Sequence, residues 1–219
     1  FGRFHEVMAE ESRQTVVAAL FDHILPLAAE LPGRLRDGIE VADIGCGMGR
    51  ALIALASEYP NSRFTGFDLS SETIEDAADR ARLLGLRNVR FEKLDLSKFD
   101  RPAAFDLVTA FDVIHDQAEP ARVLENVRAA LRPDGVFLMQ DIRTSSHLEN
   151  NIEHALGPFL YTISYNHCMT VSLAQDGAGL GTCWGRELAE QMLREARFRD
   201  VSVFQLEHDI MNDFYVART

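Results

Sequence analysis

Glycines and carboxylates of this chain stand where ligand chemistry is expected. In the stretch VADIGCGMGR (41–50), an apolar run is followed by three closely spaced glycines, Gly45, Gly47 and Gly49. Glycine has no Cβ, so such a turn lets the main chain approach a ligand closely. Asp68 follows Gly45 by 23 residues, which suits an acid that accepts hydrogen bonds from ribose hydroxyls. The spacing therefore predicts a site for a ribose-containing ligand.

Two further acids strengthen this prediction. Asp43 precedes the glycine turn, and Asp95 ends a third apolar run. A dinucleotide fingerprint, G-x-G-x-x-G, would place its third glycine at position 50, where the chain has Arg50. A nicotinamide-dependent dehydrogenase, which would use this fingerprint to bind its dinucleotide, is therefore a disfavoured alternative.

His115, in the segment AFDVIHDQ, is the candidate general base. It follows a fourth apolar run, and Asp112 or Asp116 could orient its ring. A base of this kind contributes about 10²–10⁴-fold when a nucleophile must lose a proton. The alternative is that His115 caps a helix or contacts the cofactor. Asp141, which ends a fifth run, either faces the substrate or hydrogen-bonds the loop behind it.

The region 144–183 supplies candidate acceptor contacts. Aromatic and polar side chains suited to an organic molecule are Tyr161, Tyr165, His167 and Trp184. No metal site is predicted, because the histidines of HLENNIEH lack HExxH spacing. Cys168 has no partner motif for a nucleophile and is interpreted as a small buried hydrophobe.

The elements that must position these residues alternate between strand and helix patterns. Apolar runs rich in Val, Ile, Phe and Leu are typical of a parallel sheet with helices on both faces. Right-handed crossovers then give a doubly wound α/β fold. The short link 207–212 predicts that the last two strands pair antiparallel. Ser70 or Ser71 is expected to cap the helix after the second strand, and Gly85 to end it.

We predict one domain over 1–219. A leading helix lies within 1–32, roughly Glu11 to Leu31, and a lid-like insertion occupies 144–183 after the fifth strand. A structureless loop of that length would be unusual, so the insertion is expected to contain a helix over SSHLENNIEHAL (145–156) and short strands.

The ordered motifs resemble those of class I S-adenosylmethionine-dependent methyltransferases. They are VADIGCGMG, FTGFDLS, FEKLDLSKF, FDLVTAFDVIHD and LRPDGVFLMQD. The resemblance implies a seven-stranded Rossmann-like sheet in the order 3-2-1-4-5-7-6 with the last strand antiparallel. It also implies S-adenosyl-L-methionine as cofactor and S-adenosyl-L-homocysteine as product.

The same resemblance assigns cofactor contacts by motif. Gly45, Cys46 and Gly47 would lie against the methionine moiety and ribose, and Asp68 would hold the ribose diol. The adenine would meet Leu69, Asp95 and Leu96, while Phe111 would line the pocket. The segments HCMTVSL and GLGTCWG resemble the subset with an N-terminal winged-helix domain, which would lie upstream of Phe1. Ala196-Arg197-Phe198 departs from the family's glycine turn and implies local strain if Arg197 has a positive φ.

Bulk properties narrow the function. A net charge of −12 and a pI near 5.0 argue against nucleic acid contact, which needs a basic face. Three cysteines without CxxC spacing suit a reducing cytoplasm, and no run is long enough for a membrane span. We expect a methyltransferase acting on oxygen or nitrogen of a small organic acceptor. The alternative is a non-catalytic S-adenosylmethionine sensor of a winged-helix protein, and a homodimer is left open.

Overall fold

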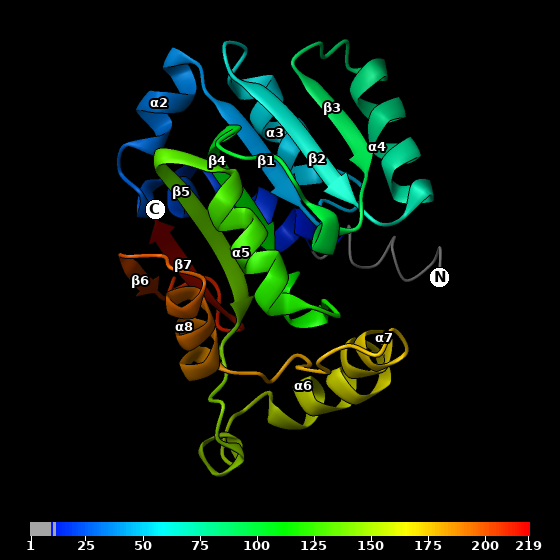
Figure 1. Ribbon diagram of the computed structural model, residues 1–219, viewed down its shortest axis with the longest axis vertical. Coiled ribbons are helices and arrows are strands. Elements are labelled where there is room, and N and C mark those ends of the chain that lie inside the picture. The colour runs from blue at the N-terminus through cyan, green and yellow to red at the C-terminus, as the bar shows by residue number, and fades with distance from the viewer. Residues whose placement is uncertain (1–9, 11) are drawn as a thin grey trace.

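The chain folds around a seven-stranded sheet in the order β3-β2-β1-β4-β5-β7-β6. The computed structural model describes residues 10 and 12–219 (Figure 1). All neighbouring strands are parallel except that β7 runs antiparallel to β5 and β6. The predicted fold class, strand order and antiparallel last strand are confirmed. The strands are β1 (Glu40–Ile44), β2 (Arg63–Asp68), β3 (Val89–Lys93), β4 (Phe105–Phe111), β5 (Leu131–Ile142), β6 (Val201–Phe204) and β7 (Asn212–Arg218).

Helices cover both faces of the sheet and its carboxyl edge. The α-helices among the described residues are α2 (Leu31–Asp37), α3 (Arg50–Glu58), α4 (Ser71–Leu83), α5 (Pro120–Ala130), α6 (Gly157–Ile163), α7 (Met169–Leu173) and α8 (Arg186–Glu195). Short helical turns are η1 (Arg13–Val17), η2 (Leu20–Ile24), η3 (Leu25–Leu27), η4 (Leu96–Lys98), η5 (Ile114–Asp116), η6 (Leu148–Asn151) and η7 (Ser164–Cys168). Within the described residues, no helix has both the length and the apolarity that a bilayer span requires.

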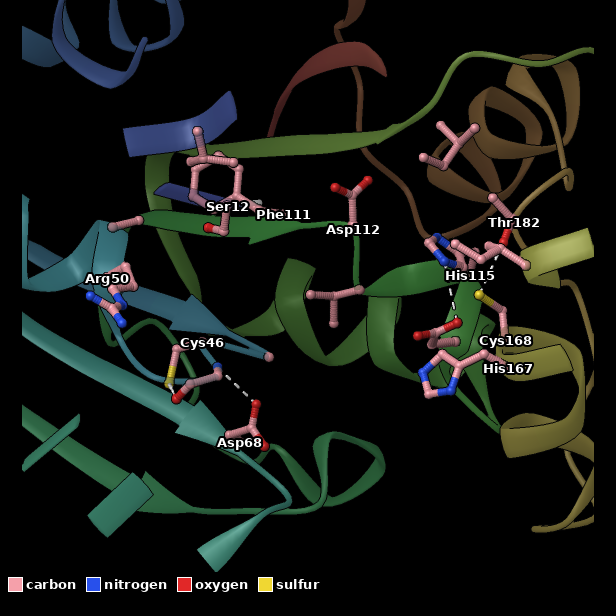
Figure 2. Close-up of a pocket in the computed structure, with 18 of the residues that line it drawn as sticks. Ser12, Cys46, Arg50, Asp68, Phe111, Asp112, His115, His167, Cys168 and Thr182 are labelled. Atoms are coloured by element: carbon pink, nitrogen blue, oxygen red, sulfur yellow. Dashed lines mark hydrogen bonds and ion pairs between the residues drawn. The ribbon is translucent and has the colours of Figure 1, made fainter. Parts of the chain in front are cut away.

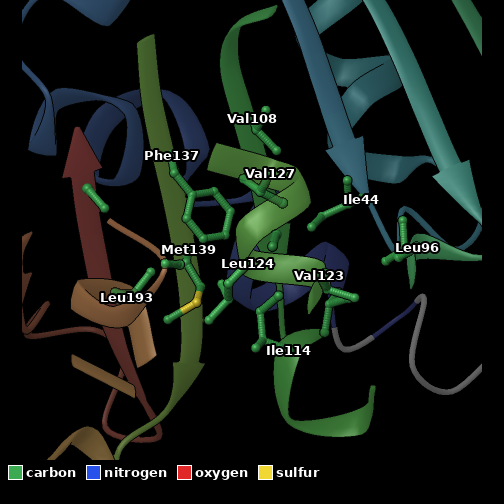
Figure 3. Packing of buried hydrophobic residues seen from close by; sticks show 14 of the residues in the cluster. Ile44, Leu96, Val108, Ile114, Val123, Leu124, Val127, Phe137, Met139 and Leu193 are labelled. Atoms are coloured by element: carbon green, nitrogen blue, oxygen red, sulfur yellow. The ribbon is translucent and has the colours of Figure 1, made fainter. Parts of the chain in front are cut away.

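Alternate residues of the central strands feed two separate cores. Val41 and Leu107 pack with the leading helical turns, α2 and α3, whereas Ala42 and Val108 pack with α5 and α8. Figure 3 shows the second core, where the side chains of Val123, Val127 and Leu193 approach strands β4 and β5. Fully burying one such side chain stabilises the fold by about 1.5–3 kcal/mol. This two-sided burial holds the carboxyl ends of the strands in fixed register.

The leading helix is shorter than predicted. Residues 1–9 and 11 of the predicted 1–32 segment lie outside the described residues. From Arg13 the chain forms η1, η2 and η3, leaves helical geometry at Ala28 (φ −113°, ψ 94°), and restarts as α2 at Leu31. Pro26 and Pro32 explain the break, because proline lacks the N–H that a continuous helix needs and is tolerated only in a first turn.

The helices of the insertion lie later than predicted. Residues 145–156 contain only the single turn η6, the helices are α6, η7 and α7, and 144–183 has no strand, so the predicted helix and short strands are wrong. Asn151 accepts the Ser145 N–H at 2.9 Å and donates to the Ser145 carbonyl at 2.8 Å. Such side chain to backbone bonds compete with a helical ladder. Figure 1 shows α6 and α7 beyond the arrowheads of β1 and β5.

Turn residues behave as expected at three positions. The Ser70 hydroxyl accepts the Thr73 N–H at 3.3 Å and caps α4. Gly85 follows that helix with φ +70°, and Arg197 has φ +69° in the turn where a glycine was missing. A left-handed conformation at a non-glycine residue costs roughly 1–2 kcal/mol, so the predicted strain is present.

Candidate active site

One cavity of about 400 Å³ joins the glycine turn to the insertion. It lies at the carboxyl ends of β1 and β4, where open α/β sheets bind ligands. Figure 2 shows Cys46, Arg50 and Asp68 at one end, which we call the cofactor end, and His115, His167, Cys168 and Thr182 at the other, the acceptor end. The predicted residues that line it are Asp43, Gly45, Cys46, Gly47, Asp68, Phe111, His115 and His167.

The glycine turn is shaped partly for the cavity and partly for packing. Gly47 has φ +51°, and a Cβ there would meet nothing within 4 Å, so it would protrude into open space. A Cβ on Gly49 would lie 2.5 Å from the Phe91 ring. The third glycine therefore serves close packing of α3 on the sheet, which explains why it can sit at 49 instead of 50.

Asp68 ties the end of β2 to the glycine turn. One carboxylate oxygen accepts the Gly47 N–H at 2.9 Å, and the other accepts the Ser70 N–H at 2.9 Å. The Thr73 hydroxyl also donates to the oxygen that accepts from Ser70, at 3.4 Å. A carboxylate has about four acceptor sites, so the oxygen bound to Gly47 keeps capacity for a ligand's hydroxyls. The geometry fits the predicted ribose contact and also makes Asp68 a support of the loop.

Asp43 is a buried acid beneath the glycine turn. Its side chain accepts the Thr109 hydroxyl at 2.6 Å, and the residue is 3% exposed. Burial, together with the charge of Asp68, raises the pKa of Asp43 to about 7 against the opposing effect of that hydrogen bond. Burial first, then Asp43 and Asp68, also raises the pKa of the Cys46 thiol well above its ordinary value. A cationic ligand at this end would favour the ionised form of Asp43.

Arg50 lines the cofactor end and was missed by the sequence analysis. Its Nε is buried and has no hydrogen-bond partner among the described residues. Buried donors are nearly always paired, so this atom indicates an anionic or carbonyl ligand. Its place in the sequence could have indicated this role, because Arg50 directly follows Gly49 of the glycine turn and begins α3.

His115 is held between two carboxylates at the acceptor end. Its Nδ1 lies 2.7 Å from Asp141 Oδ1, and its Nε2 lies 3.2 Å from Asp116 Oδ1. Burial lowers the pKa of His115, but the charge of Asp141 and the contacts with Asp116 and Asp141 outweigh it and leave that pKa well above the ordinary value. Asp112 instead accepts from the Gln140 amide at 2.8 Å.

Asp141 and Trp184 lie behind the histidine. The Trp184 indole N–H donates to Asp141 Oδ1 at 2.9 Å, and both residues are buried. Neither belongs to the cavity walls. The Asp141 carboxylate therefore orients the His115 ring and does not line the cavity. The Trp184 indole in turn holds this carboxylate in place.

Several other predicted residues lie outside the cavity walls. Leu69 and Tyr165 are exposed, Leu96 packs in the core beside α5, and the Tyr161 hydroxyl accepts from Asn151 at 3.0 Å. Asp95 accepts the Ser97 N–H at 3.0 Å and pairs with Lys98. Their contacts with adenine or acceptor stay predictions.

Comparisons with known proteins agree on one family. A methyltransferase domain family model matches residues 35–203. The chain is similar to a probable (S)-tetrahydroprotoberberine N-methyltransferase of Papaver bracteatum, with 32% identity over 48% of this chain and 30% of that protein. It is also similar to the 27-O-demethylrifamycin SV methyltransferase of Amycolatopsis mediterranei strain S699, with 34% identity over 52% of this chain and 42% of that one. The chain thus spans less than half the length of these relatives.

Solved structures share the fold. A SAM dependent methyltransferase from Aquifex aeolicus superposes with a TM-score of 0.69 at 20% identity, covering 99% of this chain and 97% of that one. The family match includes the glycine turn, Asp68, His115 and Cys168. S-adenosylmethionine is the methyl donor of this class. The chain belongs to the methyltransferase domain family, in the class I S-adenosylmethionine-dependent form that its motifs and strand order predict.

Proposed function

We propose that this chain transfers the methyl group of S-adenosylmethionine to an oxygen or nitrogen atom of a small organic acceptor. The observation that carries the proposal is a single cavity that runs from Asp68 and the glycine turn to His115. The bound cofactor supplies a methyl group already activated by a positively charged sulfur. The protein's part is then mainly to align the nucleophile, which can contribute about 7–11 kcal/mol.

The cofactor end offers one group for each part of the donor. Asp68 would accept from the ribose hydroxyls, and the buried Asp43 carboxylate would pair with the cationic amino group. The Arg50 Nε–H, which has no partner within residues 10 and 12–219, would donate to the carboxylate of the amino acid. Three chemically different groups thus discriminate the complete donor from a free nucleoside.

The acceptor end is mostly apolar with few polar groups. Phe159, Leu160 and Ile163 of α6 line this end of the cavity together with His115 and His167. Such a mixture suits an organic molecule that presents one polar atom. The names of the Papaver bracteatum and Amycolatopsis mediterranei relatives indicate transfer to nitrogen in one case and to oxygen in the other, which supports both acceptor types.

His115 is proposed to act on the acceptor's proton. Asp141 holds Nδ1, so Nε2 is the ring nitrogen left on the cavity side, beside Asp116. As the sequence predicts, Nε2 accepts the proton as a general base, which requires the neutral ring and therefore a pH above the raised pKa of His115. Asp141 then positions the ring and stabilises the imidazolium.

Calorimetry with two ligands tests the cofactor end. S-adenosylhomocysteine has the amino acid part, and 5′-methylthioadenosine lacks it. Asp43→Asn and Arg50→Gln should weaken the first ligand and leave the second unchanged. Asp68→Asn should weaken both by about 1–3 kcal/mol, because ribose hydroxyls lose their acceptor. Equal affinity of all variants for S-adenosylhomocysteine would contradict the proposed site.

Turnover tests the reaction itself. Pooled alkaloids, phenols and polyketides are screened for release of S-adenosylhomocysteine. His115→Gln should abolish release and leave cofactor affinity nearly intact. Tight cofactor binding with no release from any acceptor would refute catalysis and favour the sensor alternative.

A further inference from the structure

The acceptor end brings together three residues that can ligate a metal. His115, Asp116 and Cys168 each present one donor atom, and these atoms lie within 4.8 Å of one another. His115 and Asp116 belong to η5 after β4, whereas Cys168 ends η7 of the insertion. Imidazole nitrogen, carboxylate oxygen and thiolate sulfur are the donor types that Zn²⁺ takes.

The surroundings of His115 match those of a metal-binding histidine. A ligating histidine usually donates its other ring N–H to a carboxylate, which fixes the tautomer. Here Asp141 Oδ1 lies 2.7 Å from Nδ1 and also receives the Trp184 indole N–H at 2.9 Å. In the neutral ring with its proton on Nδ1, the lone pair of Nε2 is directed toward Asp116 and Cys168.

The other two donor atoms are Asp116 Oδ1, on a half-buried side chain, and the sulfur of the buried Cys168. Asp116 Oδ1 is inaccessible to solvent and lacks a well-formed hydrogen bond, although Nε2 is 3.2 Å away. Cys168 is 5% exposed, and its sulfur receives the Thr182 hydroxyl at 3.0 Å. An imidazole nitrogen, a carboxylate oxygen and a sulfur that face one another can hold either a proton or a metal cation between them. A general base uses only the Nε2 atom, whereas a metal ion would use all three donor atoms.

We propose that His115 Nε2, Asp116 Oδ1 and Cys168 Sγ bind Zn²⁺, with a fourth position open to the cavity for a hydroxyl acceptor. Three protein ligands and one open position are typical of catalytic zinc. The acceptor oxygen coordinates the ion and releases its proton to solvent. Its lone pair then forms the O–C bond to the methyl group as the C–S electrons return to sulfur, which yields the methyl ether and S-adenosylhomocysteine.

This inference rests on the proposed methyl transfer and changes only the role of His115. With the ion bound, Nε2 is a metal ligand and no longer a general base. The acceptor hydroxyl then loses its proton because coordination to the metal lowers its pKa. Cys168 is far from His115 along the chain, so no contiguous ligand spacing in the sequence indicates this cluster.

The decisive experiment is metal titration of chelator-treated, dialysed protein. Zn²⁺ is added in competition with a chromophoric chelator, and Co²⁺ is used as the spectroscopic probe. The expected result is one equivalent of each ion and a thiolate-to-cobalt charge-transfer band. Cys168→Ser should abolish the band, whereas the matched control Cys183→Ser should retain it. Failure to bind either ion, or a band that survives Cys168→Ser, overturns the proposal.

Two further variants separate a ligand from a structural residue. Asp116→Asn should weaken Zn²⁺ binding more strongly than Asp141→Asn, for which a loss of about 10–100-fold is expected. Unchanged Zn²⁺ affinity in both variants would overturn the assignment of these carboxylates. Calorimetry of S-adenosylhomocysteine on metal-stripped protein reports the cofactor end separately. Retained cofactor affinity without metal binding refutes the zinc site alone, and the converse refutes the proposed methyl transfer alone.

Discussion

Asp43→Asn is the substitution whose effect follows most directly from the structure. The folded protein holds the pKa of this acid at about 7, against an ordinary value of 3.8, because the side chain is buried near Asp68. Between these two values the folded state binds more protons than the unfolded state. Stability therefore falls as pH rises through this window, and the loss is complete above the folded pKa.

The magnitude follows from these two pKa values. Each unit of pKa difference corresponds to about 1.4 kcal/mol. Integrating the linkage relation from pH 5 to pH 7.5 gives a loss of about 2.5 kcal/mol in the free energy of unfolding from this group. Asparagine keeps an oxygen for the Thr109 hydroxyl but does not titrate, so the variant should lack this component.

Urea unfolding of both proteins at pH 5 and pH 7.5 measures the effect. The quantity of interest is the change in the stability difference between wild type and Asp43→Asn, because all other titrations cancel in it. The variant should gain about 2.5 kcal/mol on the wild type over this interval. Parallel stability curves, with a change below about 0.5 kcal/mol, would mean that Asp43 is not desolvated as described.

Other predictions concern the ligand and the turns. Affinity of the wild type for S-adenosylhomocysteine should rise with pH through about 7 as Asp43 ionises beside the ligand's amino group, and calorimetry should find this slope absent in Asp43→Asn. Ser70→Ala should lower the free energy of unfolding by about 1 kcal/mol through loss of the α4 cap. An unchanged urea midpoint would mean that Ser70 does not stabilise the helix as a cap. Arg197→Gly should raise stability by about 0.5–1 kcal/mol by relieving a positive φ; a lower melting temperature would contradict this strain. Gly49→Ala should unfold the protein at lower urea, since its Cβ would lie 2.5 Å from Phe91; a crystal structure of a stable variant would show how the ring moves.

The sheet could be predicted because its signals are local and repeated. Val41 and Ala42 feed opposite cores, so the run around them is apolar on both faces, as a parallel strand must be. The glycine turn and Asp68 carry their spacing within one strand–helix–strand unit. Resemblance added the strand order, which local patterns do not encode.

The acceptor end was harder to predict because its contacts join distant segments. Asp112 and Asp116 were the expected partners of His115, yet Asp141 reaches Nδ1 because β4 and β5 are neighbouring strands. The helix predicted over 145–156 does not form, because the Asn151 side chain hydrogen-bonds the backbone of Ser145. Arg50 and Cys168 became candidates only when the cavity wall was known.

Trp184 is the only tryptophan of the sequence, and its indole N–H donates to Asp141, the carboxylate that also contacts His115. Indole emission responds to nearby charge and to hydrogen bonding. The intrinsic fluorescence of the unlabelled protein should therefore change when a proton, an ion or an acceptor occupies the histidine's other nitrogen. The indole is therefore an intrinsic optical probe one carboxylate away from His115, and ligand screening of this chain can begin with fluorescence.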